Sequence, residues 1–391
     1  MNITGFDRPV FLTRVLQNEM KYVNQYPQFD GLIMDANLAN YYSNPWNKIL
    51  EKKAQGNVGF LIVDPNTAKL EHRVCVQKKT YALLSYCPDL EPLTPDDFQG
   101  ESGDSFSLQF ATNVLDTQAE LGADIFLTPY FVAKTINSPW YGVNKELVQS
   151  SLTAKGDLGL ENPLYAVICV SVSEIANDQS REIIIQDYRN LNVDGFYILA
   201  EGLSDRNSSS LELAGLLALV NSLSDFKKPV FVGSIDGFGL FSCAYGAAGF
   251  SAGICWLESF NEQNFTLELE GRNEDAMRER FIYIPEVFIK FPRDRAQLIY
   301  QNTNIEGLTS HQSSNYYNQR TINPDDRARL YFLEKRFEEL EQLKGLSDFE
   351  KKQHLTTRLE NAISISLQIS SEDIQIRYAH LGRWNEAIRS V

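Results

Sequence analysis

The segment 228–258, KPVFVGSIDGFGLFSCAYGAAGFSAGICWLE, decides the fold class. Its first apolar run ends at Asp236-Gly237, a stretch of helical character follows to Tyr245, and a second apolar run begins after a glycine turn at 246–249. A strand, a helix and a second strand in this order form a parallel pair with its crossover. The segment therefore predicts one βαβ unit, which is the repeating element of a (β/α)8 barrel.

Similar apolar runs recur along the chain, each bounded by turn residues and separated by enough chain for a helix. The eight runs cover 31–34, 58–63, 123–127, 164–172, 195–200, 230–235, 250–257 and 281–284. Eight is the number of strands that a closed (β/α)8 barrel requires. The structural alternative, a doubly wound open sheet, normally carries a glycine-rich phosphate turn after its first strand, and MDANLANYY at 34–42 lacks one. We therefore predict an α/β fold, a TIM-like barrel.

Changes in composition and hydrophobic pattern along the sequence predict three regions. We expect the barrel in 1–300, with a long, turn-rich and proline-rich loop at 65–104 after one of its strands. The polar segment 301–319 is predicted to be a linker. Residues 320–391 contain strongly helical patterns such as YFLEKRFEELEQL, which predict a C-terminal helical appendage.

Charge and composition narrow the function classes. The net charge of −15 and pI near 4.8 give a surface that on average repels phosphate backbones, so non-specific nucleic-acid binding is not expected. No apolar run is long enough for a membrane span, and the N-terminus lacks the pattern of a secretion signal. The five cysteines are dispersed, which suits a reducing compartment. These features predict a cytoplasmic protein without a His/Cys metal site, and no motif identifies a cofactor.

If the eight runs are barrel strands, the polar residues just past their ends converge on one face. These residues are Asp35, Asp64, Tyr130, Ser173, Glu201, Asp236, Glu258 and Glu286. Clustered carboxylates shift one another's pKa and can divide acid and base roles, as glycosyl transfer or hydrolysis requires, or they can hold Mg²⁺. We assign catalytic roles to Asp64 and Asp236, together with Glu201 and Glu258. The alternative is that such carboxylates cap helices and turns.

Other residues near the same strand ends are candidates for ligand binding. They are Asp35, Tyr130, Trp46, Trp140, Ser234 and Gly237. Both tryptophans lie in a polar-Pro-Trp pattern, at 44–47 and 138–141, where a sugar or a base could stack. The alternative for these loops is packing on their own side chains. The glycines of GSIDGFG fit either close approach of a phosphate or tight strand-to-helix packing.

Three segments resemble tRNA-guanine transglycosylases. VDGFYILAEGL (193–203), KPVFVGSIDG (228–237) and GFSAGIC (249–255) are similar in order and spacing to later strands of that family, and the resemblance covers about a sixth of the chain. It implies a TIM barrel related in shape. The family's nucleophilic aspartate falls at Ile254, its zinc-binding cysteines have no counterpart, and its DSGG turn is replaced by 128–130, Thr-Pro-Tyr. Base exchange by that mechanism is therefore not implied.

Two functional hypotheses follow. The first is a cytoplasmic barrel enzyme that binds a polar small molecule, sugar-like or nucleoside-like, and catalyses glycosyl or base transfer or hydrolysis. The second is a non-catalytic barrel scaffold that binds a protein partner, or a second copy of itself, through the apolar stripe of residues 320–391.

Overall fold

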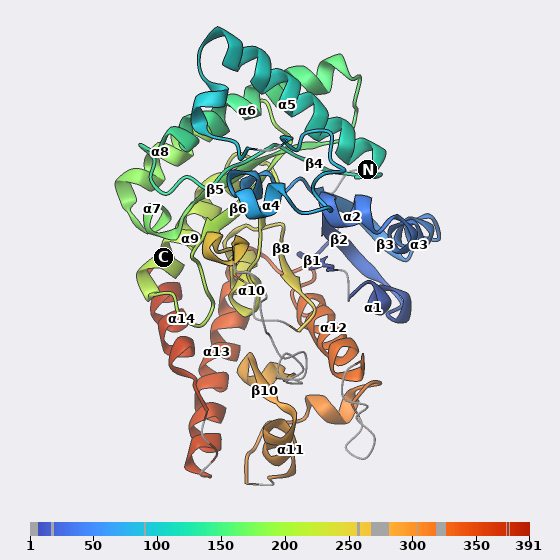
Figure 1. Cartoon of the computed structure of the whole chain (residues 1–391). Coiled ribbons are helices and arrows are strands. Elements are labelled where there is room, and N and C mark those ends of the chain that lie inside the picture. Colours follow the sequence, from blue (N-terminus) through green and yellow to red (C-terminus); the bar gives the residue numbers. More distant parts are fainter. Residues whose placement is uncertain are drawn as a thin grey trace.

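Eight parallel strands form a barrel in the described part of the chain (Figure 1). The computed structural model describes residues 7–16, 19–89, 91–255, 259–266, 281–302, 304–317, 326–372, 374 and 376–391. The barrel strands are β1 (Val10–Arg14), β2 (Phe29–Asp35), β3 (Val58–Asp64), β4 (Phe126–Leu127), β5 (Leu164–Ser171), β6 (Gly195–Glu201), β7 (Val230–Val232) and β8 (Gly249–Gly253). The predicted (β/α)8 fold is therefore confirmed.

The barrel closes between its third and fourth strands. The hydrogen-bonded order is β3-β2-β1-β8-β7-β6-β5-β4. At the seam, Ile62 and Ile125 form a parallel bridge, and the backbone nitrogen of Asp124 donates to the oxygen of Leu61 at 2.9 Å. Because all eight strands are parallel, their carboxyl ends meet at one end of the barrel, which we call the mouth.

One predicted strand does not belong to the barrel, and one barrel strand is absent from the prediction. The run at 281–284 is β9 (Phe281–Ile284), which pairs antiparallel with β10 (Ile289–Pro292), so Glu286 does not follow a barrel strand. The missing strand is β1, which lies between β2 and β8. Its sequence VFLTR has only three consecutive apolar residues and ends in an arginine, so its apolar run is shorter than those of β3, β5 and β6.

Helices surround the strands (Figure 1). Up to β8 they are α1 (Met20–Gln25), α2 (Ala36–Tyr41), α3 (Ser43–Ala54), α4 (Arg73–Val76), α5 (Gly100–Glu120), α6 (Pro139–Asp157), α7 (Val172–Ala176), α8 (Asp178–Arg189), α9 (Ser210–Ser224) and α10 (Gly237–Ser242). Local sequence sets their ends: at α9, Ser209 and Glu212 form a reciprocal capping box. The long loop after β3 holds two 3₁₀ turns, η3 (Thr67–Glu71) and η4 (Pro95–Phe98), besides α4.

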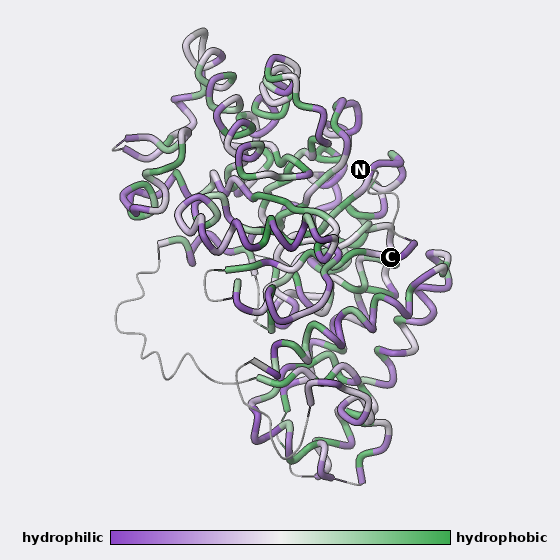
Figure 2. The backbone as a smooth tube through the Cα atoms, turned by 90° about the vertical axis from the view of Figure 1, so that its right-hand side faces the viewer, coloured by the Kyte–Doolittle hydropathy of each residue, from purple (hydrophilic) through white to green (hydrophobic). Residues whose placement is uncertain are grey.

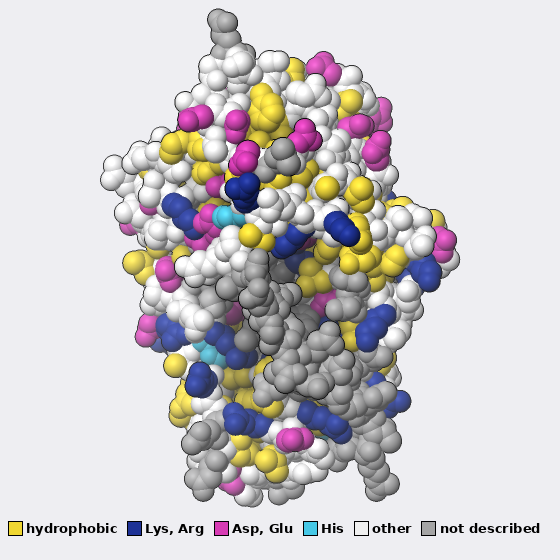
Figure 3. Space-filling model, viewed as in Figure 1, with side chains coloured by type: hydrophobic (Ala, Val, Ile, Leu, Met, Phe, Trp, Pro, Cys, Tyr) yellow, Lys and Arg dark blue, Asp and Glu magenta, His cyan; other side chains and the backbone are white. Residues whose placement is uncertain are grey.

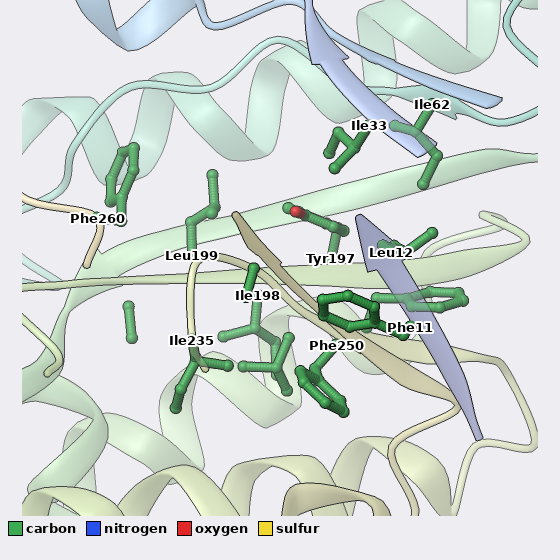
Figure 4. Close-up of a cluster of buried hydrophobic side chains, with 14 of the residues drawn as sticks. Phe11, Leu12, Ile33, Ile62, Tyr197, Ile198, Leu199, Ile235, Phe250 and Phe260 are labelled. Carbon is green, nitrogen blue, oxygen red and sulfur yellow. The ribbon is translucent and has the colours of Figure 1, made fainter. Parts of the chain in front are cut away.

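The barrel interior is filled with large side chains. Figure 4 shows Leu12, Tyr197 and Leu199 among the buried residues of this core. Tyr197 keeps its hydroxyl satisfied by a hydrogen bond of 2.9 Å to Ser251 Oγ. At Gly31 an added Cβ would lie 2.7 Å from Leu12 Cδ2, so this strand position has room only for glycine. The interior is a packed core and not a channel.

The predicted C-terminal helices are present. They are α12 (Asp326–Glu341), α13 (Asp348–Ser371) and α14 (Ala379–Ser390). A further helix, α11 (Arg293–Gln301), lies before the predicted helical region. Figures 1 and 2 show this region extending from one side of the barrel. The rings of Phe332 and Phe337 on α12 lie 6.3 and 5.9 Å from that of Phe11 on β1. The helix α12 therefore covers β1 from outside, as the eighth helix of a (β/α)8 barrel does.

A buried ionic network fixes α12 to the barrel. Arg336 is fully buried and donates to Asp236 at 2.9 Å and to Glu339 at 2.8 Å. Lys290 of β10 contacts the other oxygen of Asp236 at 2.5 Å, and Arg358 of α13 contacts Glu339 at 2.8 Å. Because buried charges are costly unless they are paired, this network requires α12, β10 and α13 together.

Substituting Arg336 tests this role. In Arg336→Ala the buried Asp236 and Glu339 each lose a partner, and we expect the free energy of unfolding to fall by about 3 to 5 kcal/mol. Urea denaturation followed by circular dichroism measures this change. The matched control is Arg389→Ala, because Arg389 and its partner Glu360 are both more than half exposed; its expected loss is below about 1 kcal/mol. Equal losses in the two variants would contradict a structural role for the network.

Candidate functional site

An arginine on β1 organises one side of the mouth. Arg14 is the last residue of β1, and its guanidinium donates to Asp35 at 2.6 Å and to Asp64 at 2.8 Å. These carboxylates end β2 and β3, where they lie side by side in the strand register. Asp35 also accepts from Asn66 Nδ2 at 2.6 Å and from Lys69 Nζ at 3.3 Å. Burial opposes ionisation of Asp35, but the charges of Lys69 and Arg14 outweigh it and hold the pKa of Asp35 below its usual value.

Asp64 accepts three hydrogen bonds. Its side chain is 2 % exposed, and it accepts from Arg14, from the backbone nitrogen of Asn66 at 2.9 Å and from the hydroxyl of Tyr130 at 2.7 Å. Tyr130 is in turn held by Thr67, whose hydroxyl contacts the Tyr130 backbone oxygen at 2.6 Å. Asp64 and Tyr130 are therefore fixed in the floor of the mouth, and the Asp64 oxygens are already engaged.

A second group of charged residues lies at the same end of the barrel. Lys134, in the loop after β4, contacts Glu201 Oε1 at 3.0 Å and Glu262 Oε2 at 2.5 Å. Glu201 ends β6, and Glu262 follows β8. The other oxygen of Glu262 lies 3.4 Å from His72 Nε2. Figure 3 shows basic, acidic and histidine side chains next to one another on one face of the molecule.

Glu71 is a carboxyl group of the mouth with a strongly raised pKa. Burial of its side chain raises its pKa to about 8, and the nearby charge of Glu262 acts in the same direction. Hydrogen bonds from the Val132 backbone and the Trp140 side chain and the charge of Lys134 only partly oppose this shift. The Glu71 residue is partly exposed to solvent. A carboxyl group that is protonated at neutral pH and reachable from solvent can act as a general acid.

The segment 259–266, which we call the strap, crosses the mouth. The Gly202 backbone nitrogen donates to Phe260 O at 2.9 Å, and Cys75 Sγ donates to Phe265 O at 3.4 Å. The ring of Phe265 contacts that of His72, with centroids 5.7 Å apart. The strap thus joins the loop after β6 to the loop after β3, with Glu262 between the two attachments.

The structure brings together part of the predicted catalytic set. Asp64 and Glu201 both lie at the mouth, whereas Asp236 lies at the start of α10, in the buried network with Arg336 and Lys290. The structural reason is that β7 ends at Val232, four residues before Asp236, and the chain has already turned outward toward α12. Glu258 lies outside the described residues.

Several predicted ligand-binding residues have packing roles. Trp46 is 2 % exposed and its indole donates to Leu121 O at 3.0 Å. A Cβ at Gly237 would lie 2.7 Å from the Trp384 ring, so this glycine makes room for α14. The Ser234 backbone nitrogen donates to Ser251 Oγ at 3.0 Å, which ties β7 to β8.

Trp140 does lie near the mouth, but its faces are not open. It stacks on Phe131 with centroids 4.1 Å apart, and its side chain donates a hydrogen bond to Glu71. Of the predicted binding residues, Asp35 and Tyr130 are at the mouth, and both are engaged in the hydrogen bonds described above.

The sequence prediction missed the residues Arg14, Glu71, His72, Lys134 and Glu262. Arg14 is absent from the predicted site because the sequence pattern does not predict the strand β1 that carries it. Lys134 comes seven residues after the end of β4, and Glu71 lies in the 65–104 loop, where no spacing rule predicts which side chain turns inward. The only available signal was general: long loops after barrel strands border the mouth.

Among the described residues, no group of three or more His, Cys, Asp or Glu side chains is placed to hold a metal ion. In that same part of the chain, no helix combines the length and apolar character needed to cross a membrane.

The chain matches no protein-family model and no curated protein. Similar solved structures include a candidate phosphonomutase from Burkholderia cenocepacia, 13% identical with a TM-score of 0.38, covering 64% of this chain and 88% of that chain. Another is a type I 3-dehydroquinate dehydratase from Clostridium difficile, 12% identical with a TM-score of 0.33, covering 67% and 90%. A candidate lyase/mutase from Burkholderia cenocepacia is 14% identical with a TM-score of 0.34, covering 64% and 78%. None of these three is a tRNA-guanine transglycosylase, and such weak similarity assigns no reaction.

Replacing Arg14 tests the organisation of the mouth. Arg14→Met leaves Asp35 and Asp64 side by side without their shared cation, and we expect a loss of about 3 kcal/mol in the free energy of unfolding at pH 7. Because the pKa of Asp35 then rises, part of this loss should disappear as the pH falls toward 4. Urea denaturation at several pH values measures both effects. Lys53→Met is the control, since Lys53 and Asp124 form a pair in which each side chain is about a quarter exposed. A loss in Arg14→Met no larger than in this control would contradict the assignment.

Proposed function

We propose that the chain is an enzyme whose active site is the mouth of the barrel, and that it transfers or hydrolyses a glycosyl or nucleoside-like bond by acid–base catalysis. The observation that carries this proposal is the Glu71 carboxyl group, with a pKa raised to about 8, beside the Lys134–Glu201 pair. Neighbouring carboxyl groups with different acidities are what such reactions require.

The two carboxyl groups take different roles. Protonated Glu71 gives its proton to the leaving oxygen or nitrogen as the bond to the anomeric carbon breaks. Water or another acceptor attacks that carbon and gives its proton to the Glu201 carboxylate. Lys134 Nζ, 3.0 Å from Glu201, orients this carboxylate. Protons and bonds balance, because the acid loses one proton and the base gains one.

The carboxylates already engaged in hydrogen bonds have a supporting role in this proposal. Asp64 already accepts from Arg14, Tyr130 and Asn66, so it has little capacity left for a substrate proton. We therefore assign an acid–base role to Glu71 in place of Asp64 and Asp236, and we keep the role predicted for Glu201. Phe260 is buried, with its ring centroid 6.4 Å from that of Tyr130 and 5.5 Å from that of Phe265, so it contributes apolar packing beneath the strap.

The scaffold hypothesis would have to use another surface than the one first predicted. The apolar side chains of α12 that form the predicted stripe, among them Tyr331, Phe332 and Leu333, are buried. Phe332 packs toward β1, so this side of α12 serves the fold.

Activity assays test the proposed roles. We expect the protein to cleave at least one member of a panel of aryl glycosides and nucleosides, with kcat reduced at least about 100-fold in Glu71→Gln and in Glu201→Gln. The rate of the wild-type protein should fall above about pH 8, where Glu71 loses its proton. The control is Glu91→Gln, a surface carboxylate that is three-quarters exposed and should leave kcat unchanged. If no member of the panel binds or reacts, the proposed function is wrong.

The pH dependence of stability tests the state of Glu71 without any substrate. Its folded-state pKa of about 8 lies above the ordinary value of 4.5, so the stability linked to its proton is complete below pH 4.5 and is lost as the pH rises toward 8. Between pH 5 and 8.5 we expect the wild-type protein to lose roughly 1 to 3 kcal/mol relative to Glu71→Gln. Urea denaturation of both proteins at each pH gives the difference. A constant difference would show that Glu71 has an ordinary pKa.

A further inference from the structure

The Glu262 carboxylate is held by basic groups from two different loops. Its Oε2 lies 2.5 Å from Lys134 Nζ, in the loop after β4, and its Oε1 lies 3.4 Å from His72 Nε2, in the loop after β3. Glu262 is the only charged residue in the strap, SFNEQNFT. Lys134 supplies a charged ammonium, whereas burial lowers the pKa of His72, which therefore supplies a neutral imidazole. An ammonium and an imidazole that converge on one carboxylate form the elements of an anion-binding subsite.

The basic groups and the carboxylate differ in how they are anchored. Next to Lys134, the Ala133 backbone exchanges hydrogen bonds with Cys169 at 3.2 Å and Ser171 at 3.0 Å, which ties this loop to β5. The His72 backbone oxygen accepts a hydrogen bond from the Cys75 backbone nitrogen at 2.8 Å, at the start of α4. Lys134 and His72 are thus part of the scaffold. Glu262 belongs to the strap, whose attachments described above are two hydrogen bonds and aromatic packing.

The exposure and charge of these side chains also allow an added anion to replace the Glu262 carboxylate beside Lys134. The Lys134 side chain is 52% exposed and that of Glu262 is 22% exposed, so an anion can reach the ammonium from solvent. Replacing the Glu262 carboxylate by another anion keeps a negative charge beside Lys134, which also contacts Glu201 at 3.0 Å.

We propose that Lys134 and His72 form an anion subsite at the mouth, which Glu262 occupies as an internal stand-in for a carboxylate or phosphate group of the ligand. This inference rests on the proposed function and refines its ligand class: the sugar-like or nucleoside-like ligand carries an anionic group. Binding of that group displaces Glu262 and loosens the strap from the mouth.

Anion binding to the full-length protein tests the subsite independently of catalysis. Titration calorimetry with inorganic phosphate and with malonate, at constant ionic strength, compares the wild-type protein with Glu262→Gln. Because the tethered carboxylate competes with every added anion, we expect Glu262→Gln to bind at least one probe about tenfold or more tightly. Adding Lys134→Gln to Glu262→Gln should abolish the gain. Stronger binding of phosphate or of malonate then identifies which anion the ligand carries.

A matched control separates a local effect from net charge. Glu360→Gln removes one surface carboxylate that is 52% exposed and pairs with Arg389, far along the chain on α13. If Glu360→Gln increases the affinity for the anion as much as Glu262→Gln does, the proposal is overturned. It is also overturned if the increase persists in the double variant Glu262→Gln with Lys134→Gln. In the wild-type protein, saturating amounts of the tighter probe should speed amide hydrogen exchange at 259–266, and unchanged exchange there would also overturn it. These measurements need no turnover, so they can fail while the Glu71 tests succeed, or the reverse.

Discussion

The pairing of Arg14 with Asp35 and Asp64 is the interaction on which the mouth depends. Three adjacent strands place one guanidinium and two carboxylates at the same end of the barrel, and each of the three side chains is at most 11% exposed. Charges buried to this degree are tolerated only with partners in good geometry. The Arg14 pairs therefore fix the positions of the ends of β1, β2 and β3, and they also bind the loop residue Asn66 through both carboxylates.

This arrangement separates the carboxyl groups of the mouth into two kinds. The charges of Lys69 and Arg14 hold the pKa of Asp35 below its usual value, and Asp64 accepts hydrogen bonds from Arg14, Asn66 and Tyr130, so both carboxylates act as structure. Glu71 lies where burial outweighs its donors, so its proton is retained to about pH 8. A site that contains both kinds can place one carboxyl group as an acid near another that accepts a proton. The chemistry we propose follows from this difference in environment and not from the number of carboxylates.

The C-terminal region completes the barrel through a comparable interaction. Arg336 reaches Asp236 from a helix one hundred residues further along the chain. The helix α12 covers β1, and α14 packs over Gly237 through Trp384. Asp236 thus contributes to the closure of the barrel wall, although it follows a strand in the sequence as a catalytic residue would. Position after a strand and accessibility to a ligand are different properties, and burial against α12 decides between them here.

The sequence by itself determined the fold class. Apolar runs alternate with helical segments along the chain, and a parallel barrel is the simplest fold that buries the apolar surfaces of both the strands and the helices. It also placed Asp35, Asp64, Tyr130 and Glu201 at the mouth, since the strand period fixes where a strand ends. It did not identify β1, whose short apolar run ends in Arg14, a largely buried arginine that is tolerated inside the barrel because it is paired with carboxylates such as Asp35 and Asp64. The tertiary structure alone decided which carboxylates are neutralised and which remain available. That decision depends on contacts between residues far apart in the chain, such as Lys134 with Glu262 and Arg336 with Asp236, and local sequence patterns carry no information about them.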